Sequence, residues 1–507
     1  MRAGIVANWP ETLSAHRDRI AIVDGERSAT FGELDAAAWD VAATIVAASE
    51  RFGGPIAVFI PKSFDAVAAF LGILLSGNFY SPLDTASPTP RLQKVLRTLE
   101  PEFLVTTAEL AGRLEGTDLG DTKVLIAGPG GDVEHAKRVS RDRLETLIDT
   151  DPLYVKFTSG STGEPKGVVL PHRAVIDYID WARVEFGVTS ESIIGNQAPF
   201  YFDVSVQDIY LCLTTGARLV LIPDSLFVFP AKLLEYVAEQ KVTFICWVPS
   251  LVVNVANLDL LGRADHGHFE TVAVLGEVMP TRQFNHWIEH LPNARFYNTY
   301  GPTESAIAST FFEVDRAFED GEPLPIGRPC PNSDVFVLSD LGERVTTPGE
   351  LGEICVRGSS LALGYWGAPE KTSAAFVRNP ARSQYPETIY RTGDLGSWND
   401  HGELMFAGRR DSQIKHMGYR IELGEIETVA ASLDGLDACC VLYDESSREI
   451  TLFYMAAEER AVGALRRELK GLLPNYMLPR AFRHLTAFPL NPNGKVDRPR
   501  LRREYMA

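Results

Sequence analysis

Short apolar runs of strand length alternate along the chain with stretches whose apolar residues recur at helical spacing. The run PIAVFI at 55–60 predicts a buried strand, and AVAAFLGILLSG at 66–77 predicts a helix that ends at Gly77. Four later runs predict further strands: KVLIA at 123–127, ARLVLI at 217–222, KVTFICWV at 241–248 and TVAVLG at 271–276. Because strands and helices alternate, the pattern favours an α/β fold.

The pattern changes near residue 325, where shorter apolar runs are separated by Gly and Asp turns. The runs are SDVFVLSD, GEICVRG and GELMFAGRR. They predict a β-rich lobe attached to the large α/β domain.

A different unit begins after residue 410, where IELGEIETVAASL has the apolar spacing of an amphipathic helix. The residues on its apolar face are Ile426, Val429, Ala430 and Leu433. The remaining chain, roughly 95 residues, is long enough for a small α+β domain. We therefore predict a large domain at 1–410 and a small domain at 411–507, with a hinge near Asp411.

Composition excludes several classes of protein. The 507 residues are 45% hydrophobic and 23% charged, as in an ordinary globular chain. A net charge of −18 argues against a nucleic-acid binder. No apolar run approaches the ~20 residues of a membrane-spanning helix, and the N-terminus lacks a secretory signal, so we expect no membrane insertion and a cytoplasmic location. The six cysteines form no CxxC pair and have no His-flanked spacing, so they indicate neither zinc nor disulfides.

The charge is unevenly distributed. The stretch from Arg466 to Glu504 holds ten Lys and Arg residues against three acidic ones. A solvated helix face explains such a stretch, and so does a docking surface for an acidic partner.

The segment TSGSTGEPKG at 158–167 carries the strongest chemical signal, directly after the strand-like LYVKF. Its glycines let the backbone approach a ligand, its hydroxyls and N–H groups are donors, and Lys166 adds a positive charge. The segment is not a Walker A loop, because GxxxxGK[ST] is not satisfied. It predicts a phosphate-binding loop, with a Ser/Thr/Gly linker as the alternative.

This loop resembles the signature of the adenylate-forming superfamily, which contains non-ribosomal peptide synthetase adenylation domains, acyl-CoA synthetases and luciferases. The chain also contains eight further motifs of the superfamily, in the order typical of the superfamily. They are SGNFYSPLD (76–84), FDVSVQD (202–208), NTYGPTE (298–304), GELGEICVRG (349–358), YRTGD (390–394), GRRDSQIKHMGYRIELGEIE (408–427), LPNYMLP (473–479) and NPNGKVDR (491–498). The chain most resembles the amino-acid-activating branch, including free-standing enzymes such as D-alanine–carrier-protein and prolyl-carrier-protein ligases.

The resemblance implies the adenylate-forming enzyme fold and a reaction in two steps. A carboxylate and ATP give an acyl-AMP and pyrophosphate, and the acyl group then passes to a thiol. The implied cofactors are ATP and Mg²⁺. The implied acceptor is the phosphopantetheine arm of a carrier protein, which we expect to be a discrete protein because no carrier motif follows before Ala507.

Family roles can be assigned to the nucleotide-binding residues by their motifs. The loop residues that would hold the phosphates are Thr158, Ser159, Gly160, Ser161, Thr162, Gly163 and Lys166. Glu304 resembles the magnesium ligand, an oxygen donor suited to a hard cation. Thr303 would contact the α-phosphate, and Tyr300 would stack on adenine, although alone it indicates only a packed turn residue.

Three further residues would complete the nucleotide site. Asp394 resembles the aspartate that accepts both ribose hydroxyls, with an Asx-turn as the alternative. Arg409 resembles an arginine near the ribose and phosphates. Lys495 resembles the catalytic lysine that the small domain brings to the carboxylate and α-phosphate, whereas a lysine in a Pro/Asn/Gly turn is otherwise a solvated surface residue.

Asp203 in FDVS occupies the position that pairs with the substrate ammonium in the amino-acid branch. A buried carboxylate without that partner would be costly, so Asp203 favours an amino acid over a plain acid, although it can also cap the following helix. The other residues laid onto the family's substrate pocket are Val204, Gln207, Cys246, Ala273, Leu275, Thr299, Ile307 and Ala308. None is charged, which disfavours a charged side chain on the substrate.

The opening trio Asp203, Val204 and Gln207 resembles a proline-selecting pocket, and the remaining pocket positions depart from that pattern. L-Proline is the first expectation, and alanine (D or L) or another small neutral amino acid is the second. Two other functions stay open: an acid–CoA ligase, and a homologue that binds a ligand without catalysing a reaction.

Overall fold

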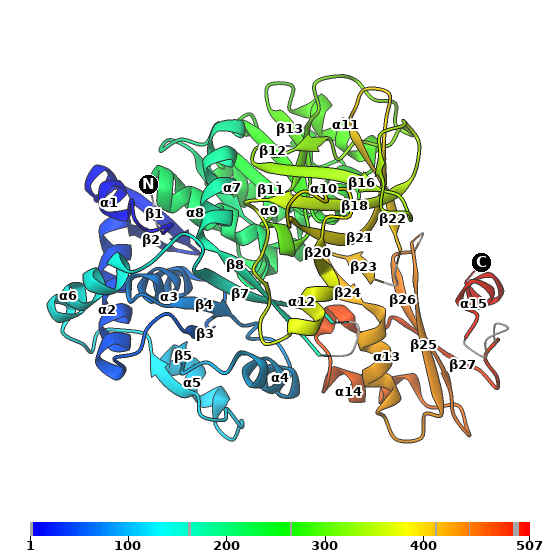
Figure 1. Cartoon of the computed structure of the whole chain (residues 1–507), viewed down its shortest axis with the longest axis horizontal. Helices are drawn as coiled ribbons and strands as arrows, with labels where there is room; N and C mark the ends of the chain where they lie inside the picture. The colour runs from blue at the N-terminus through cyan, green and yellow to red at the C-terminus, as the bar shows by residue number, and fades with distance from the viewer. Residues whose placement is uncertain are drawn as a thin grey trace. The chain divides into compact units, whose positions relative to one another are not determined.

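The predicted helix at 66–77 begins two residues earlier in the structure, as α3 (Phe64–Leu75). Ser63 determines this start, because its Oγ accepts a hydrogen bond from Ala66 N at 3.3 Å. The computed structural model describes residues 4–160, 164–263, 266–410, 413–445, 447–489 and 496–506. In these residues strands and helices alternate as expected, and the predicted α/β class is confirmed (Figure 1).

The chain forms two compact units. The first contains Met1–Thr85, Thr98–Lys156 and Gly167–Arg410, and the second contains Ala86–Arg97, Phe157–Lys166 and Asp411–Ala507. The second unit therefore includes two segments from the part of the chain that we assigned to the large domain. That 411–507 moves as a lid stays a prediction.

A nine-stranded sheet in the first unit has a parallel centre and antiparallel edges. Its strands, in spatial order, are β15 (Arg328–Pro329), β14 (Thr310–Glu313), β13 (Arg295–Tyr300), β12 (Thr271–Leu275), β11 (Phe244–Trp247), β9 (Ile193–Asn196), β10 (Arg218–Leu221), β1 (Ile20–Asp24) and β2 (Arg27–Thr30). Three of the predicted strands are confirmed here as β10, β11 and β12. Strand β11 is shorter than predicted, because Lys241 adopts a left-handed turn conformation with φ 55°.

A seven-stranded sheet contains the predicted strands at 55–60 and 123–127. Its order is β19 (Gly364–Tyr365), β8 (Lys166–Pro171), β7 (Pro152–Thr158), β4 (Phe79–Pro82), β3 (Pro55–Phe59), β5 (Phe103–Thr106) and β6 (Lys123–Ile126). Because β3, β4, β5 and β6 pair in parallel, their carboxyl ends lie at one edge of the sheet.

The predicted β-rich lobe is a separate antiparallel sheet. It contains β17 (Arg344–Val345), β16 (Ser333–Leu338), β18 (Gly352–Gly358), β21 (Thr388–Trp398) and β20 (Phe376–Arg378), with β22 (Leu404–Arg409) paired to β21. Antiparallel hairpins need only short turns, which explains the Gly and Asp residues between the apolar runs.

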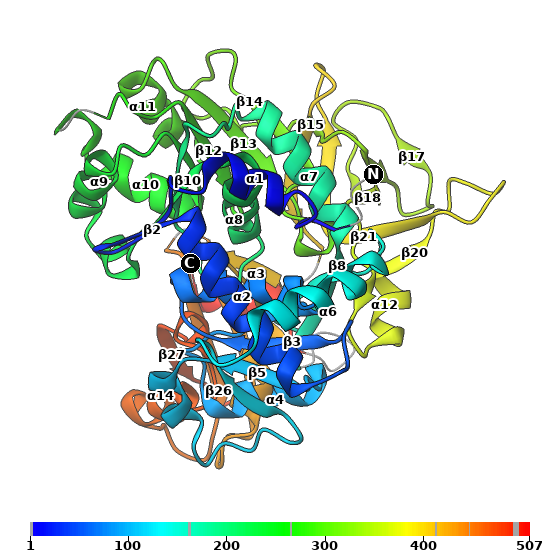
Figure 2. The ribbon, with the colours of Figure 1, turned by 90° about the vertical axis from the view of Figure 1, so that its left-hand side faces the viewer.

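Helices cover the sheets of the first unit. They are α1 (Trp9–His16), α2 (Phe31–Ala48), α3, α5 (Ala108–Ala111), α6 (Val133–Glu145), α7 (His172–Glu185), α8 (Val204–Thr215), α9 (Pro230–Glu239), α10 (Pro249–Asn257), α11 (Thr281–His290) and α12 (Pro369–Ala375); α4 (Thr89–Leu99) crosses the boundary between the units. Helices α2 and α3 lie side by side (Figures 1 and 2). Residues of α2, α3, α7 and α8 share one apolar core with strands of the two larger sheets. No described helix is both long enough and apolar enough to cross a membrane.

The second unit is an α+β arrangement, as the sequence predicts for this region. Its elements after residue 412 are β23 (Gln413–His416), β24 (Tyr419–Glu422), α13 (Leu423–Ala431), β25 (Ala438–Asp444), β26 (Glu449–Met455), α14 (Val462–Lys470), β27 (Ala481–His484) and α15 (Arg498–Tyr505). The predicted apolar face is confirmed within α13, since Ile426 and Ala430 are buried and Val429 packs against the same core. Leu433 is also buried in this core, but it lies beyond the end of the helix.

Candidate active site

The Asp394 carboxylate lies inside the first unit at a turn-like irregularity of strand β21. Asp394 is 2% exposed, and its backbone N–H donates to Thr392 Oγ1 at 3.0 Å. Thr392 Oγ1 donates in turn to the carbonyl of Ile354 on β18 at 2.7 Å. These bonds hold the backbone beside Asp394 in place without a ligand.

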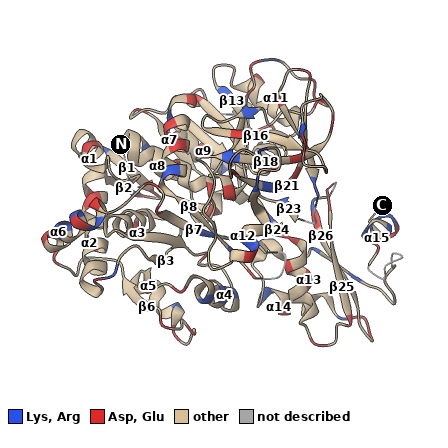
Figure 3. Cartoon of the chain, in the orientation of Figure 1, with Lys and Arg blue, Asp and Glu red and all other residues tan. Residues whose placement is uncertain are grey.

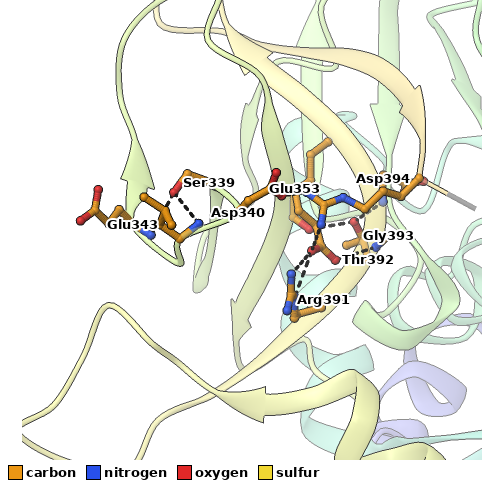
Figure 4. A network of polar contacts seen from close by, with 11 residues as sticks. Ser339, Asp340, Glu343, Glu353, Arg391, Thr392, Gly393 and Asp394 are labelled. Carbon is orange, nitrogen blue, oxygen red and sulfur yellow. Dashed lines mark hydrogen bonds and ion pairs between the residues drawn. The ribbon is translucent and has the colours of Figure 1, made fainter.

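Glu353 holds the same turn from the neighbouring strand (Figure 4). Its Oε2 accepts from Arg391 Nε at 3.0 Å and from Nη2 of the same guanidinium, and its Oε1 accepts from Gly393 N at 3.1 Å. Gly393 has φ 74°, a conformation that favours glycine. Glu353 lies in the GELGEICVRG motif, but nothing in the sequence marked it as a site residue.

Two side chains bond the Asp394 carboxylate. Tyr300 Oη donates to Oδ2 and Arg409 Nη1 donates to Oδ1, each at 2.5 Å. The structure therefore brings together the three residues predicted for adenine, ribose and phosphate contacts. Because Asp394 accepts from side chains rather than from a turn amide, the Asx-turn alternative is disfavoured. Each carboxylate oxygen has a second lone pair, so the group can still accept a ribose hydroxyl.

Glu304 lies in a short 3₁₀ turn, Thr303–Ser305, that follows β13 after Gly301 and Pro302. Its residue is fully buried, and its Oε1 accepts from Tyr365 Oη at 2.8 Å. A buried carboxylate is the oxygen donor that a hard cation prefers, so the residue fits the predicted Mg²⁺ role. Tyr365, which orients this carboxylate from β19, has no sequence signal that marks it.

The loop after Glu304 has an unusual backbone. Ala306 and Ile307 are fully buried and have φ of 52° and 68°, values that a β-branched residue rarely adopts. Such conformations persist where surrounding packing enforces them, and they concentrate at ligand sites. Ile307 is one of the predicted pocket residues.

Asp203 begins helix α8, and its Oδ1 accepts from Val204 N at 2.9 Å. The alternative interpretation of this residue as a helix cap therefore has a structural basis. One hydrogen bond to Oδ1 leaves acceptor capacity on the carboxylate, so capping and ammonium binding are compatible.

The predicted pocket residues converge on one region of the first unit. Cys246 on β11 is in register with Ala273 on β12, and Leu275 is in register with Thr299 on β13. The members that share one apolar core cluster are Val204, Cys246, Ala273, Leu275, Ile307 and Ala308. The register and the shared core thus bring together positions that are far apart in the sequence.

Lys156 on β7 is a charged residue near this pocket that the sequence analysis did not identify. It is 2% exposed, and its Nζ donates to the Phe202 carbonyl and to Ser205 Oγ, the latter at 3.1 Å. Burial lowers the pKa of Lys156 to about 7, and the nearby Asp203 carboxylate opposes that shift. The only available signal was a lysine inside the apolar run LYVKF.

A buried polar network holds Gln207. Tyr178 Oη on α7 donates to Gln207 Oε1 at 2.5 Å. Gln207 Nε2 donates to Asp208 Oδ1 at 3.5 Å, and Asn196 Nδ2 donates to Asp208 Oδ2 at 2.8 Å. Burial raises the pKa of Asp208 to about 7, against the stabilising hydrogen bonds from Asn196 and Gln207.

The described part of the phosphate loop belongs to the second unit. Ser159 Oγ donates to the Arg420 carbonyl at 2.7 Å, and Gly160 N donates to Glu425 Oε2 at 3.3 Å. Lys166 Nζ lies 3.7 Å from Glu422 Oε1. Glu425 thus accepts from a loop N–H, and Glu422 lies near the loop lysine. An anion such as phosphate could bind the same N–H and the same lysine.

Two local features of the loop also fit a phosphate ligand. A Cβ on Gly160 would lie 2.0 Å from the Glu164 carbonyl oxygen, so the turn requires glycine. Thr158 Oγ1 is buried and has no hydrogen-bond partner among the described residues. Five predicted site residues lie outside the described part of the chain: Ser161, Thr162, Gly163, Asp411 and Lys495.

Comparisons with known proteins identify the family of this chain. The model of the AMP-binding enzyme family matches residues 9–366. The L-proline–[L-prolyl-carrier protein] ligase of Streptomyces coelicolor is 32% identical, covering 97% of this chain and 94% of that protein. Tyrocidine synthase 3 of Brevibacillus parabrevis is 33% identical over 97% of this chain, which spans only 7% of that synthase.

Solved structures show the same fold. The crystal structure of IdnL1 has a TM-score of 0.80 at 30% identity and covers 96% of this chain and 98% of that one. The Vibrio cholerae adenylation domain AlmE, in complex with glycyl-adenosine-5'-phosphate, has a TM-score of 0.85 at 21% identity and covers 100% and 98%. The predicted adenylate-forming fold and the resemblance to adenylation domains are confirmed, and the chain belongs to the AMP-binding enzyme family.

Proposed function

We propose that this protein activates an amino acid with ATP, forming an aminoacyl-AMP and pyrophosphate, and then transfers the acyl group to the phosphopantetheine thiol of a carrier protein. The observation that carries the proposal is that residues 299–308 belong to both predicted sites. Thr299, Ile307 and Ala308 are pocket residues, whereas Tyr300 and Glu304 are nucleotide residues. One loop would thus place a carboxylate next to an α-phosphate.

The protein's own groups would act mainly by positioning and charge. Asp394 would accept the ribose hydroxyls, and Arg409 would place a cation beside the nucleotide. Glu304 would hold Mg²⁺, which neutralises phosphate charge when it is bound. Lys495 would add a second positive charge at the reacting carboxylate during the first step only.

Three considerations support a small neutral amino acid, with L-proline first. The pocket residues are apolar apart from Asp203, Gln207 and Thr299. Gln207 is held by Tyr178 and Asp208, so its amide is fixed in place. A relative that is 32% identical is named as an L-proline ligase. Alanine and other small neutral amino acids fit the same apolar lining.

A second candidate substrate class is a carboxylic acid without an ammonium group, as in an acid–CoA ligase. The buried Lys156 favours it, because a protonated lysine would balance Asp203 within the protein. An amino acid brings an ammonium group into the pocket and a plain acid does not, so a panel of both kinds of substrate separates the two candidates.

The test is ATP–pyrophosphate exchange with L-proline, L- and D-alanine and plain carboxylic acids. We expect exchange with L-proline, reduced about 100-fold or more in Lys495→Ala, since a catalytic charge in a closed site is worth several kcal/mol. Lys470→Ala, on the exposed end of α14, is the matched control and should leave exchange unchanged. Exchange with plain acids alone would overturn the amino-acid proposal.

We propose that the carrier protein docks on the basic end of the second unit. Helix α15 carries a cluster of arginines (Figure 3). Arg498 and Arg500 pair with Glu427 and Glu504, whereas Arg502 and Arg503 are exposed.

A double charge reversal, Arg502→Glu with Arg503→Glu, tests this docking surface. We expect the KM for a holo-carrier protein to rise about tenfold while pyrophosphate exchange is unchanged, since rim charges act mainly on association. Arg138→Glu, exposed on α6, is the control. An equal effect of both reversals would contradict the assignment.

A further inference from the structure

Three metal-ligating side chains gather on the first unit, away from the motifs of the proposed reaction. Asp259, His286 and His290 each place one ligand atom within 4.8 Å of the others. Asp259 follows the end of α10, and both histidines lie on α11. Because Asp259 lies far from the two histidines in the sequence, no spacing motif marked these three residues as a site.

The two histidines have the spacing that a helix uses to bind a metal. Residues four apart project from the same helix face, and His286 and His290 have ring centroids 4.3 Å apart. The opposite face of α11 is buried through Phe284 and Trp287, so the helix itself is fixed by packing. The pair is therefore presented by a rigid element.

His290 has its tautomer set for metal binding. Its Nδ1 lies 2.8 Å from the His286 carbonyl oxygen, which can only accept, so Nδ1 carries the proton. The lone pair is then on Nε2. Metal-bound histidines commonly donate their other N–H to a backbone carbonyl in this way. A favourable contact with the helix dipole would explain His290 alone, but not the convergence of the other two residues.

His286 also has a ring nitrogen without a hydrogen bond. Its Nε2 is buried and makes no hydrogen bond within the part of the chain that the structure describes. The Asp259 Oδ1 atom lies 3.5 Å away, close enough for an ion to bind both. Asp259 has φ 49°, a left-handed conformation that aspartate and asparagine tolerate better than most residues.

We propose that Asp259, His286 and His290 form a binding site for a divalent transition-metal ion, Zn²⁺ by its chemistry. Two imidazoles and one carboxylate are a ligand set that zinc takes in tetrahedral sites, with water as the fourth ligand. The ion would join α11 to the segment after α10. In the chain, α10 follows β11 and α11 follows β12, the strands that carry the predicted pocket residues Cys246, Ala273 and Leu275.

The test uses the full-length untagged protein with Zn²⁺ and a chromophoric chelator as competitor. We expect one ion per chain in the wild type, and binding at least about tenfold weaker in His286→Gln, His290→Gln and Asp259→Asn. Asparagine keeps the left-handed backbone of residue 259 acceptable, so Asp259→Asn tests the charge rather than the turn. His401→Gln, exposed on another part of the first unit, should bind as the wild type does.

Substitution with Co²⁺ gives a second readout. We expect visible absorption of tetrahedral Co²⁺ in the wild type and in His401→Gln, and its loss in the double variant His286→Gln with His290→Gln. Zn²⁺ should also raise the melting temperature of the wild type but not of the double variant, because a ligand that binds only the folded state stabilises it. Equal Zn²⁺ affinity in the wild type and the double variant would overturn the proposal.

Discussion

The nucleotide end and the amino-acid end of the proposed active site satisfy their charges differently. The nucleotide end is defined here as Tyr300, Glu304, Tyr365, Asp394 and Arg409. Each carboxylate of this end accepts a hydrogen bond from a side chain of the protein. At the amino-acid end, the buried Lys156 and Asp208 have pKa values shifted to about 7 from opposite directions.

The two ends therefore have different roles: the nucleotide end holds its side chains in position, and the amino-acid end changes its charge with pH. Paired groups at the nucleotide end are held in position by side chains of the protein before a ligand binds. The amino-acid end changes its charge near neutral pH, because burial disfavours the charged forms of Lys156 and Asp208. We therefore expect substitutions at the nucleotide end to impair the use of ATP and Mg²⁺, and those at the amino-acid end to alter the affinity for the amino acid and its pH dependence.

The largest effect is expected for Asp394→Asn. The amide cannot accept as strongly from two ribose hydroxyls, and the change removes the carboxylate that pairs with Arg409. Charge-assisted hydrogen bonds are worth about 1.5–3 kcal/mol each, so pyrophosphate exchange should fall about 100-fold or more. The measurement is pyrophosphate exchange with ATP varied at saturating amino acid, and with the amino acid varied at saturating ATP.

The control for Asp394→Asn is Asp400→Asn, an exposed aspartate in the turn between β21 and β22. It should have wild-type exchange. If Asp394→Asn raised only the KM for the amino acid, the assignment of this residue to the nucleotide end would be wrong.

A smaller effect, on affinity alone, is expected for Tyr178→Phe. The change removes the donor to Gln207 Oε1 in a fully buried network. An unsatisfied buried acceptor costs about 1–3 kcal/mol, so the KM for the amino acid should rise about tenfold with the KM for ATP unchanged. Tyr236→Phe removes a buried hydroxyl without a hydrogen bond among the described residues and should be neutral. An equal rise of both KM values would contradict a positioning role for Tyr178.

The contrast between the two ends also explains which residues the sequence could predict. Asp394, Glu304 and Arg409 lie in motifs with a fixed order, so their convergence could be expected before the structure. Tyr178 lies on α7, one helix before Gln207, and only the packing of α7 on α8 makes them neighbours. No local pattern marks such a pair.

The burial of Lys156 explains why the sequence did not mark it as a site residue. The run LYVKF predicted a strand, but a lysine in a strand usually points to solvent. Lys156 is buried because β7 lies inside the seven-stranded sheet, with α8 contacting its side chain through Ser205. The sequence could indicate the strand, whereas the burial of its charge depends on the tertiary packing.

A pH-dependent effect of a few-fold is expected for Lys156→Met. Below about pH 7 Lys156 is protonated and Asp208 is neutral, and above it Lys156 is neutral and Asp208 is charged. The site thus becomes more negative as pH rises, which favours a substrate ammonium. The KM for an amino acid should fall as pH rises through about 7 in the wild type, and less so in the variant.

Lys123→Met, an exposed lysine on β6, is the control for this pH profile. A plain acid should show the opposite trend, because added negative charge repels its carboxylate. A KM for the amino acid that rises with pH in the wild type would contradict the charge assignment and favour the plain-acid alternative.

The smallest effect is expected for Tyr365→Phe, which removes one neutral donor from Glu304 Oε1. The carboxylate stays in place, so the rate at saturating Mg²⁺ should change little. Its direction becomes less fixed, and one hydrogen bond is worth about 1 kcal/mol, so the Mg²⁺ concentration at half-maximal exchange should rise about three- to fivefold. Tyr385→Phe is the matched control, because Tyr385 Oη donates to Glu387 Oε1 at 3.1 Å on the exposed surface. A lower rate with an unchanged Mg²⁺ midpoint would show that Tyr365 supports the fold of the loop rather than the orientation of Glu304.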